Sequence, residues 1–371
     1  MKFNKITENY LSNKPKSYVN KDDEINPDFI RFDAGEDYLI ENKASNFFNL
    51  IKDIDIKSYP DNTTHKLKES IAKMFNISVS QIVLGNGSDE FIENIPRMIL
   101  EKNDSSLVIN PTFFRFSDSV KRAGGIIESI NLKEEKSFDI DEDIADEIIQ
   151  KANSKNIRLL WLCNPNNPTG NIIKKDLIVK ILDSVSCPVV MDEVFFEFYD
   201  SLNKDSAIHL IKNYDNLIVV RSLSKANGLA GLRVGYAVAN QTIIEELEKY
   251  RLPYNIPSIS QVIASNEIND LEKFKNHINK VNEIRKEFIN KLKSIPNVII
   301  GGNSKTNVFL LRVKDKKIYQ MLLKNGIICA NFDNCPGLEG QGYVRVTIRS
   351  KEDNDIFIEK LKEAVRNGSI N

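Results

Sequence analysis

The apolar run Leu217-Ile-Val-Val220 is followed, after one arginine, by Ser222-Leu-Ser-Lys225 and then by Gly228-Leu-Ala-Gly-Leu-Arg233. Such a run is typical of a strand that is buried on both faces of a sheet. Two hydroxyls, a lysine and a more distant arginine come where that strand would end. These residue types suit a reactive amine beside an anion site, although lysine and arginine are as often solvated surface charges. The rest of the chain has to decide between the two interpretations.

Four more short apolar runs lie upstream, separated by stretches with helical patterns. They are Ile82-Val-Leu84, Ser106-Leu-Val-Ile109, Ile157-Arg-Leu-Leu-Trp-Leu162 and Pro188-Val-Val-Met191. Near-continuous apolar runs that alternate with helices predict an α/β fold with a largely parallel sheet covered on both faces. Such sheets bind ligands at the carboxyl ends of their strands. The residues directly after each run are therefore the candidates for a site.

Polar or Gly/Pro-rich residues follow every one of these runs. They are Gly85-Asn-Gly-Ser-Asp-Glu90, Asn110-Pro-Thr-Phe113, Cys163-Asn-Pro-Asn-Asn-Pro-Thr-Gly170, Asp192-Glu193 and Ser222-Leu-Ser-Lys225. Glycines at the first of these turns let backbone N–H groups and Ser88 cradle a phosphate, although a lone glycine-rich turn is a weak signal. Asp192 can pair with a protonated ring nitrogen, or it can serve as a cap or an ion-pair partner. Asn167 lies in a loop fixed by two prolines, from which it can donate to a phenolate oxygen.

Composition limits the classes of function. The 371 residues include 51 basic and 52 acidic side chains, a formal net charge of −1, so no overall field favours nucleic acid or an anionic membrane as a partner. No secretion signal opens the chain, and no run approaches the roughly 18 apolar residues of a membrane span, so we expect a cytoplasmic protein. The four cysteines and three histidines have neither disulfide-scaffold nor metal-ligand spacing, and we expect no metal.

The pattern changes after about residue 255. Apolar residues recur at three- and four-residue steps between Ile278 and Ile295, which predicts a long amphipathic helix that bridges to a second unit. Strands are expected at 307–313 and 343–349, and a closing helix at 353–365. The predicted organisation is an N-terminal arm over 1–30, a large cofactor-binding domain over 58–269, and a smaller α+β domain made of 31–57 and 270–371.

In this order, the motifs resemble those of the fold-type-I pyridoxal-phosphate enzymes, and among these the histidinol-phosphate aminotransferase group of the class I/II aminotransferases. The resemblance covers roughly residues 30–365. It implies a large domain built on a mostly parallel seven-stranded sheet plus a smaller α+β domain. It also implies pyridoxal 5′-phosphate as the cofactor and a small molecule as the substrate.

The resemblance implies a role for each strand-end residue. Lys225 is similar to the lysine that bonds to the cofactor and moves protons on the substrate. Asp192 would pair with the pyridine nitrogen, and Asn167 would bind the ring hydroxyl; these three are the expected catalytic residues. Phe113 is similar to the aromatic residue that stacks on the ring. The residues expected to hold the cofactor phosphate are Ser88, the backbone of Gly87 and Asp89, Ser222, Ser224 and Arg233.

Two further matches concern the substrate and a second subunit. Arg345 is similar to an arginine that grips a substrate carboxylate, for which a bidentate guanidinium is better suited than lysine. Tyr59 is similar to a tyrosine that reaches the phosphate site of the neighbouring subunit. The resemblance therefore implies an obligate homodimer.

Three positions depart from the pattern of the family. Phe195 stands beside the cofactor ring where a tyrosine is usual, so it cannot donate a hydrogen bond to the ring oxygen. Gly35, in the expected substrate loop, replaces a common asparagine, and Ala330 stands where an arginine is often found. The expected substrate-binding residues are therefore Arg345, Arg349 and Gly35.

These departures keep an alternative open. Phe195, the segment Asn334-Cys-Pro-Gly-Leu338 and the paired Arg345 and Arg349 look more like threonine-phosphate decarboxylase. The first hypothesis is an aminotransferase that acts on a small phosphorylated amine or amino acid with a donor such as glutamate. The second is a decarboxylase of threonine or serine phosphate, and the third a non-catalytic binding protein that has kept the fold.

Overall fold

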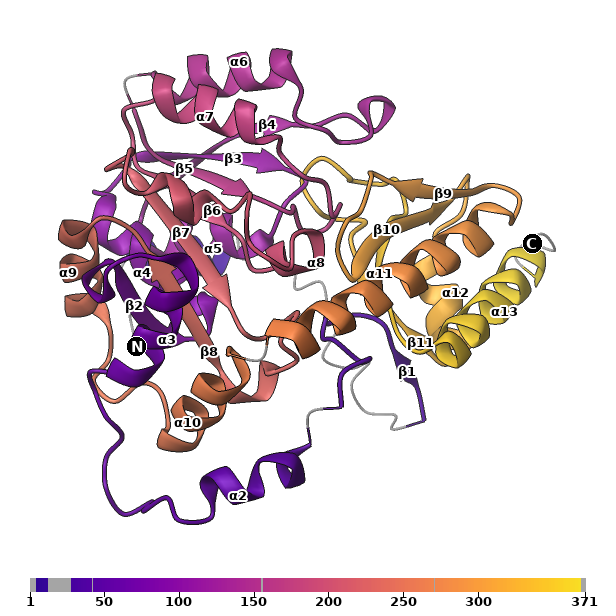
Figure 1. Ribbon diagram of the computed structural model, residues 1–371. Helices are drawn as coiled ribbons and strands as arrows, with labels where there is room; N and C mark the ends of the chain where they lie inside the picture. The colour runs from indigo at the N-terminus through magenta and orange to yellow at the C-terminus, as the bar shows by residue number, and fades with distance from the viewer. Residues whose placement is uncertain (1–4, 13–27, 42, 155, 270, 368–371) are drawn as a thin grey trace.

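Seven strands form the central sheet of the larger lobe (Figure 1). The computed structural model describes residues 5–12, 28–41, 43–154, 156–269 and 271–367. The strands, in sheet order, are β2 (Ile82–Asn86), β8 (Val234–Val238), β7 (Leu217–Ser222), β6 (Val189–Asp192), β5 (Ile157–Cys163), β3 (Ser105–Asn110) and β4 (Ile126–Asn131). All neighbours pair in parallel except β8, which is antiparallel to both β2 and β7. The predicted α/β class with a mostly parallel seven-stranded sheet is confirmed.

Helices pack on both faces of this sheet. Successive strand residues point to opposite faces, so Leu217 and Val219 join one buried cluster and Ile218 and Val220 join the other. The first cluster is covered by α3 (His65–Phe75), α6 (Glu142–Ala152), α7 (Lys175–Ser184) and α10 (Ser258–Glu267). The second is covered by α4 (Ser88–Ile99), α5 (Phe114–Arg122) and α9 (Gln241–Tyr250). Near-continuous apolar runs are thus explained by burial on two sides.

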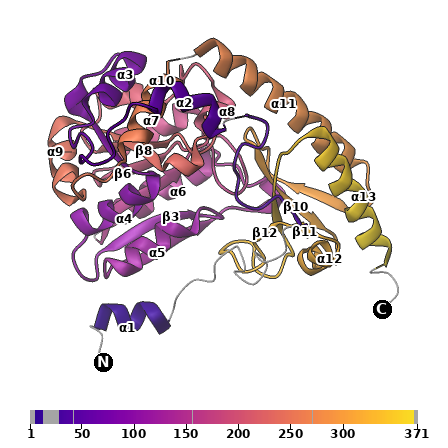
Figure 2. The same ribbon diagram turned by 90° about the horizontal axis from the view of Figure 1, so that it is seen from below.

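The smaller lobe contains an antiparallel four-stranded sheet. Its strands, in sheet order, are β12 (Ala330–Asn331), β13 (Val344–Thr347), β10 (Val308–Val313) and β9 (Val298–Gly301). Its helices are α12 (Ile318–Lys324) and α13 (Lys351–Asn367), and a short parallel pair joins β1 (Ile30–Arg31) to β11 (Ile327–Ile328). The predicted long helix is α11 (Leu271–Lys293), which runs from the large lobe along the small one beside α13, as Figure 2 shows.

The segment before residue 58 contacts both lobes. Strand β1 pairs with β11, and Phe32 packs in the core of the small lobe. Phe47, in contrast, joins the core of the large lobe, where α2 (Phe48–Ile51) lies against α10. Most of the predicted arm lies outside the described residues; its helix α1 (Lys5–Ser12) contacts α5. The predicted domain boundaries stay a prediction.

Within the part of the chain that the structure describes, no helix has the length and apolar character needed to cross a membrane.

The close approach of β8 to the turn before α4 can be tested at Gly235. A Cβ at this position would lie against the backbone of Gly87 and Ser88. We expect Gly235→Ala to lower the free energy of unfolding by about 1–3 kcal/mol, because backbone atoms cannot give way as a flexible side chain can. Denaturant unfolding of the cofactor-free protein measures this. Gly231→Ala is the matched control, since nothing lies within 4 Å of its added Cβ; equal losses in both variants would contradict the argument.

Candidate active site

The five strand ends meet in one pocket at the carboxyl edge of the large sheet. Its volume is about 690 Å³. The predicted residues that line it are Ser88, Asp89, Phe113, Asn167, Asp192, Phe195, Ser222, Ser224, Lys225, Arg233 and Arg345. All but the last lie at the ends of strands of the large sheet or in the segments that follow them, whereas Arg345 comes from β13 of the small lobe. The pocket therefore lies where the two lobes meet.

Lys225 places its amine inside this pocket. Nζ donates a hydrogen bond of 2.9 Å to the carbonyl oxygen of Ala34 and lies 5.4 Å from the centre of the Phe195 ring. Burial lowers the pKa of Lys225 to about 8, and the positive charges of Arg345 and Arg233 act in the same direction. About a tenth of this amine is therefore neutral, and nucleophilic, at pH 7, and about half of it at pH 8.

Asp192 ends β6 and faces the same pocket. Its Oδ1 accepts a 3.0 Å hydrogen bond from the backbone N–H of Val194. Burial raises the pKa of Asp192 to about 7, and the nearby carboxylates of Asp89 and Glu193 raise it as well. A cationic group bound against this carboxyl would favour its ionised form. The environment suits a partner for a protonated ring nitrogen.

Hydrogen-bond donors gather at the end of the pocket next to α4. Gly87, with a φ of 73°, precedes this helix, so the first backbone N–H groups and the positive end of the helix dipole face the pocket. The Ser222 hydroxyl donates to the Ser224 hydroxyl at 2.9 Å, and the Arg233 guanidinium lies 3.4 Å from the Asp89 carboxylate. This combination of N–H groups, hydroxyls and a guanidinium is the chemistry of a phosphate site.

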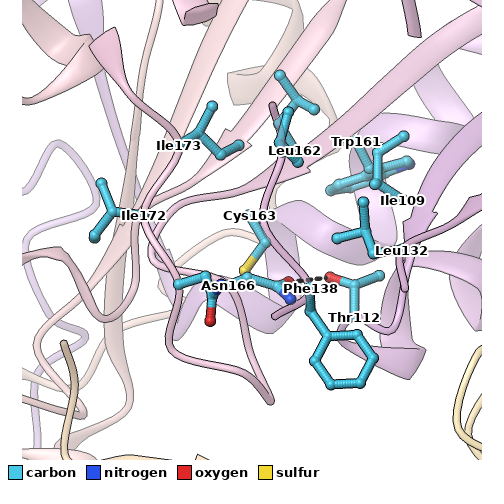
Figure 3. A pocket seen from close by; sticks show the side chains of 12 residues that line it. Ile109, Thr112, Leu132, Phe138, Trp161, Leu162, Cys163, Asn166, Ile172 and Ile173 are labelled. Carbon is cyan, nitrogen blue, oxygen red and sulfur yellow. Dashed lines mark hydrogen bonds between the residues drawn. The ribbon is translucent and has the colours of Figure 1, made fainter. Parts of the chain in front are cut away.

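The loop that carries Asn167 is held in place by hydrogen bonds of the neighbouring residue, Asn166. The amide of Asn166 accepts a 2.9 Å hydrogen bond from the Thr112 hydroxyl and donates one of 2.8 Å to the Pro111 carbonyl. Figure 3 shows Asn166 and Thr112 facing each other at the edge of a second, small cavity, which is lined mostly by apolar side chains. Cys163 lines both cavities. Asn167 is therefore presented to the main pocket by a loop that is anchored, through Asn166, to the segment after β3.

Arg345 reaches this loop from the small lobe. Its Nη1 donates a 2.7 Å hydrogen bond to Oδ1 of Asn167, and its Nη2 donates to the carbonyl oxygen of Asp33. Ala330 pairs with Arg345 across β12 and β13 and is fully buried. A guanidinium thus stands at the pocket wall opposite the sheet, where it can bind a carboxylate in a bidentate manner.

Besides Gly87, which precedes α4, three predicted residues lie beyond the lining of the pocket. Tyr59 is 80% exposed and stacks on Tyr254, with ring centres 4.6 Å apart. Arg349 lies 3.9 Å from the centre of the Tyr38 ring. Gly35 borders the pocket, since a Cβ on it would lie 3.5 Å from Nζ of Lys225. The roles expected for these residues, and for those in the pocket, stay predictions.

Three lining residues were not predicted: Ala34, Cys163 and Val194. Cys163 and Val194 directly adjoin strand ends that the sequence did single out, so the same rule would have found them. Ala34 lies 191 residues from Lys225 along the chain, and its contact is made by a backbone carbonyl. Its residue type carries no signal for that role.

Comparison with known proteins decides the family. The model of class I and II aminotransferases matches residues 31–361. The chain belongs to this family. A histidinol-phosphate aminotransferase of Thermoanaerobacter sp. (strain X514) is 40% identical over 361 residues, which cover 96% of this chain and 99% of that protein. One from Caldanaerobacter subterraneus subsp. tengcongensis is 34% identical, with the same two coverages.

Solved structures agree with this assignment of the aminotransferase fold. The histidinol-phosphate aminotransferase of Clostridium acetobutylicum superposes with a TM-score of 0.80 at 26% identity, over 91% of this chain and 99% of that one. The L-threonine-O-3-phosphate decarboxylase of Porphyromonas gingivalis gives 0.76 at 23% identity over the same shares, which shows the fold alone. The predicted resemblance is confirmed.

Class I and II aminotransferases use pyridoxal 5′-phosphate, and the pocket of this aminotransferase fits that cofactor. Lys225 offers the amine, Asp192 a carboxyl for the ring nitrogen, and the donors around Ser222 and Arg233 an anion site. Among the residues that the structure describes, no group of three or more His, Cys, Asp or Glu side chains is arranged to hold a metal ion.

The pKa of Lys225 can be tested through the attachment of the cofactor. Only the neutral amine attacks the cofactor aldehyde, so the attachment rate of the cofactor-free enzyme should rise about tenfold per pH unit below pH 8 and level off above it. Growth of the visible absorbance band after rapid mixing measures the rate. Lys225→Ala, which lacks the amine, is the blank. A rate that keeps rising through pH 10, as expected for an ordinary solvated lysine, would contradict the prediction.

Proposed function

We propose that this enzyme transfers an amino group between a small phosphorylated amine and an amino acid such as glutamate, with histidinol phosphate as the first phosphorylated substrate to test. The observation that carries the proposal is the meeting of Lys225, Asp192 and Arg345 in one pocket. Relatives named histidinol-phosphate aminotransferase, 31–40% identical over most of the chain, support the choice of substrate.

The residues of the pocket divide the work of such a transfer. When bound, pyridoxal phosphate supplies an electron-withdrawing ring that weakens the bonds at the substrate Cα. Asp192 would hold the ring nitrogen in its charged form, and Asn167 would donate to the ring hydroxyl. Lys225, whose pKa of about 8 leaves part of the amine neutral near neutral pH, would take the proton from the substrate Cα and return it on the far side of the substrate nitrogen. Arg345 would hold the carboxylate of the amino-acid substrate.

The role of Arg345 can be tested against a matched arginine on the same segment. We expect Arg345→Lys to raise the KM for glutamate by about ten- to a hundredfold, because lysine cannot form the bidentate pair. Arg349→Lys is the control, since that guanidinium contacts Tyr38 and Asp353 and does not line the pocket. Steady-state kinetics with varied glutamate measure both variants. An equal or larger effect of Arg349→Lys on the KM for glutamate would contradict the assignment of the carboxylate site to Arg345.

The decarboxylase alternative keeps one observation in its favour. Phe195 lies against the Lys225 amine and cannot hydrogen-bond a ring oxygen. The paired arginines that suggested a decarboxylase are separated in space, because Arg349 does not line the pocket. Carbon dioxide release from threonine or serine phosphate without a keto acid would establish this alternative. Loss of the visible cofactor band on addition of glutamate, and its return with a keto acid, would support transamination.

We also propose that the enzyme works as a homodimer in which Tyr59 completes the site of the partner. Tyr59 is 80% exposed although its ring stacks on Tyr254. Ile56 and Leu252, which are close to these two tyrosines in sequence, are 82% and 72% exposed. Large exposed apolar side chains that lie close together are typical of a protein–protein interface. A tyrosine from a second subunit could add a hydroxyl to the phosphate site.

Subunit mixing tests this dimer. Lys225→Ala should be inactive, and Tyr59→Ala should bind the cofactor about tenfold less tightly because a hydrogen bond to a charged group is lost. After exchange of subunits in mild denaturant, mixed dimers contain one site with both native residues. We therefore expect activity at limiting cofactor to exceed the sum of the two variants alone. A monomer in light scattering, or no recovery on mixing, would contradict the proposal.

A further inference from the structure

A buried network of charges lies near the carboxyl edge of the sheet, on the side of β7 that faces away from the pocket. Its centre is Arg221 on β7, whose side chain is fully buried. Its Nε donates to Oε2 of Glu193 at 2.9 Å and its Nη1 to Oε1 of Glu197 at 2.7 Å. Its Nη2 donates to Oδ1 of Asn203 at 3.0 Å and to the Ser206 hydroxyl at 2.9 Å. Nothing in the proposed reaction uses this arginine.

The network lies directly behind the residues of the pocket. Side chains alternate between the two faces of a strand, so Ser222 faces the pocket while Arg221 faces away. Strands β6 and β7 pair up to Asp192 and Val220, and the N–H of Glu193 donates to the Val220 carbonyl at 2.9 Å. The ion pair between Arg221 and Glu193 therefore joins the two strands where their ladder ends. Because Asp192 and Ser222 directly adjoin Glu193 and Arg221, a bridge at this point can restrain the separation of the two pocket-facing residues.

The same network holds the segment between the two glutamates. Glu193 and Glu197 bracket Val194 and Phe195, and both carboxylates are bound by Arg221. The Val194 N–H donates to the Asp192 carboxylate, and the Phe195 ring lies under the amine of Lys225. Displacement of either glutamate would therefore move two contacts inside the pocket.

Stability alone does not explain such a network. A buried ion pair costs much of its attraction in lost hydration, and apolar replacements are often neutral or stabilising. Burial raises the pKa of Glu197, which shows that its charge is held at a cost. Fixed geometry is the property that directional hydrogen bonds supply and apolar packing does not.

We propose that Arg221, bound to Glu193, is a positioning residue for the cofactor: it sets the spacing between the carboxyl that meets the ring nitrogen and the hydroxyls that meet the phosphate. The proposal depends on the cofactor and not on the substrate of the proposed function. A test by cofactor binding therefore stands or fails independently of which amine is the substrate.

Glu193→Gln is the decisive variant. The two carboxylate oxygens of Glu193 accept from Arg221, the Ser206 hydroxyl and the Ala207 N–H. A glutamine has one acceptor oxygen, so its NH₂ group must face a donor on one side. We expect the Kd for pyridoxal phosphate to rise about tenfold or more and the absorbance band of the bound cofactor to shift. Glu197→Gln should have a smaller effect, because one oxygen can still accept from Arg221.

Cofactor titration and the thermal unfolding of the cofactor-free protein are measured together. Lys68→Met is the control: it breaks the 2.6 Å ion pair with Glu248 between α3 and α9, and should lower the Tm without changing the Kd. If Glu193→Gln does not fold, Ser206→Ala takes its place as the test. It removes one hydrogen bond from Glu193 and one from Arg221, and should give a smaller rise in the Kd for pyridoxal phosphate. If the folded variant has a lowered Tm but an unchanged Kd for pyridoxal phosphate and an unchanged absorbance band of the bound cofactor, the network has only a structural role. That result would overturn the proposal.

Discussion

The parallel pairing of β5, β6 and β7 is the constraint on which the active site depends. In a parallel sheet the strands end at the same edge, and here the register aligns Cys163 with Asp192 and Asp192 with Val220. The segments that follow these residues therefore lie side by side at that edge. Each segment contributes a different functional group, such as a carboxyl or an amine. The parallel sheet brings these groups together because its strands end at the same edge.

Burial gives this convergence its reactivity. The same desolvation lowers the pKa of Lys225 to about 8 and raises that of Asp192 to about 7, because it disfavours whichever form is charged. The pKa values of an amine and a carboxyl, ordinarily far apart, are thus both brought close to neutral pH. The buried ion pair of Arg221 and Glu193 joins the end of β7, which leads to Lys225, to the residue that follows Asp192.

The small lobe completes the site from the other side. Thr347 accepts a 3.0 Å hydrogen bond from the Gly35 N–H, and Asn307 donates to the carbonyls of Gly35 and Glu36. These bonds hold the loop whose Ala34 carbonyl meets Lys225. Arg345 projects from the same sheet to the Asn167 loop. The substrate side of the pocket is therefore built by contacts between residues that are distant in sequence.

The sequence by itself determined the fold class and most of the residues that line the pocket, since both follow from a local pattern: an apolar run and the polar residues that come after it. It did not reveal β4, whose edge position leaves an alternating, partly exposed pattern, or β8, which is buried but interrupted by Gly235. Only the tertiary structure placed Ala34 against Lys225, put Arg345 in the pocket and Arg349 outside it, and hid Arg221 behind Asp192. These depend on how separate segments pack, which no local pattern records.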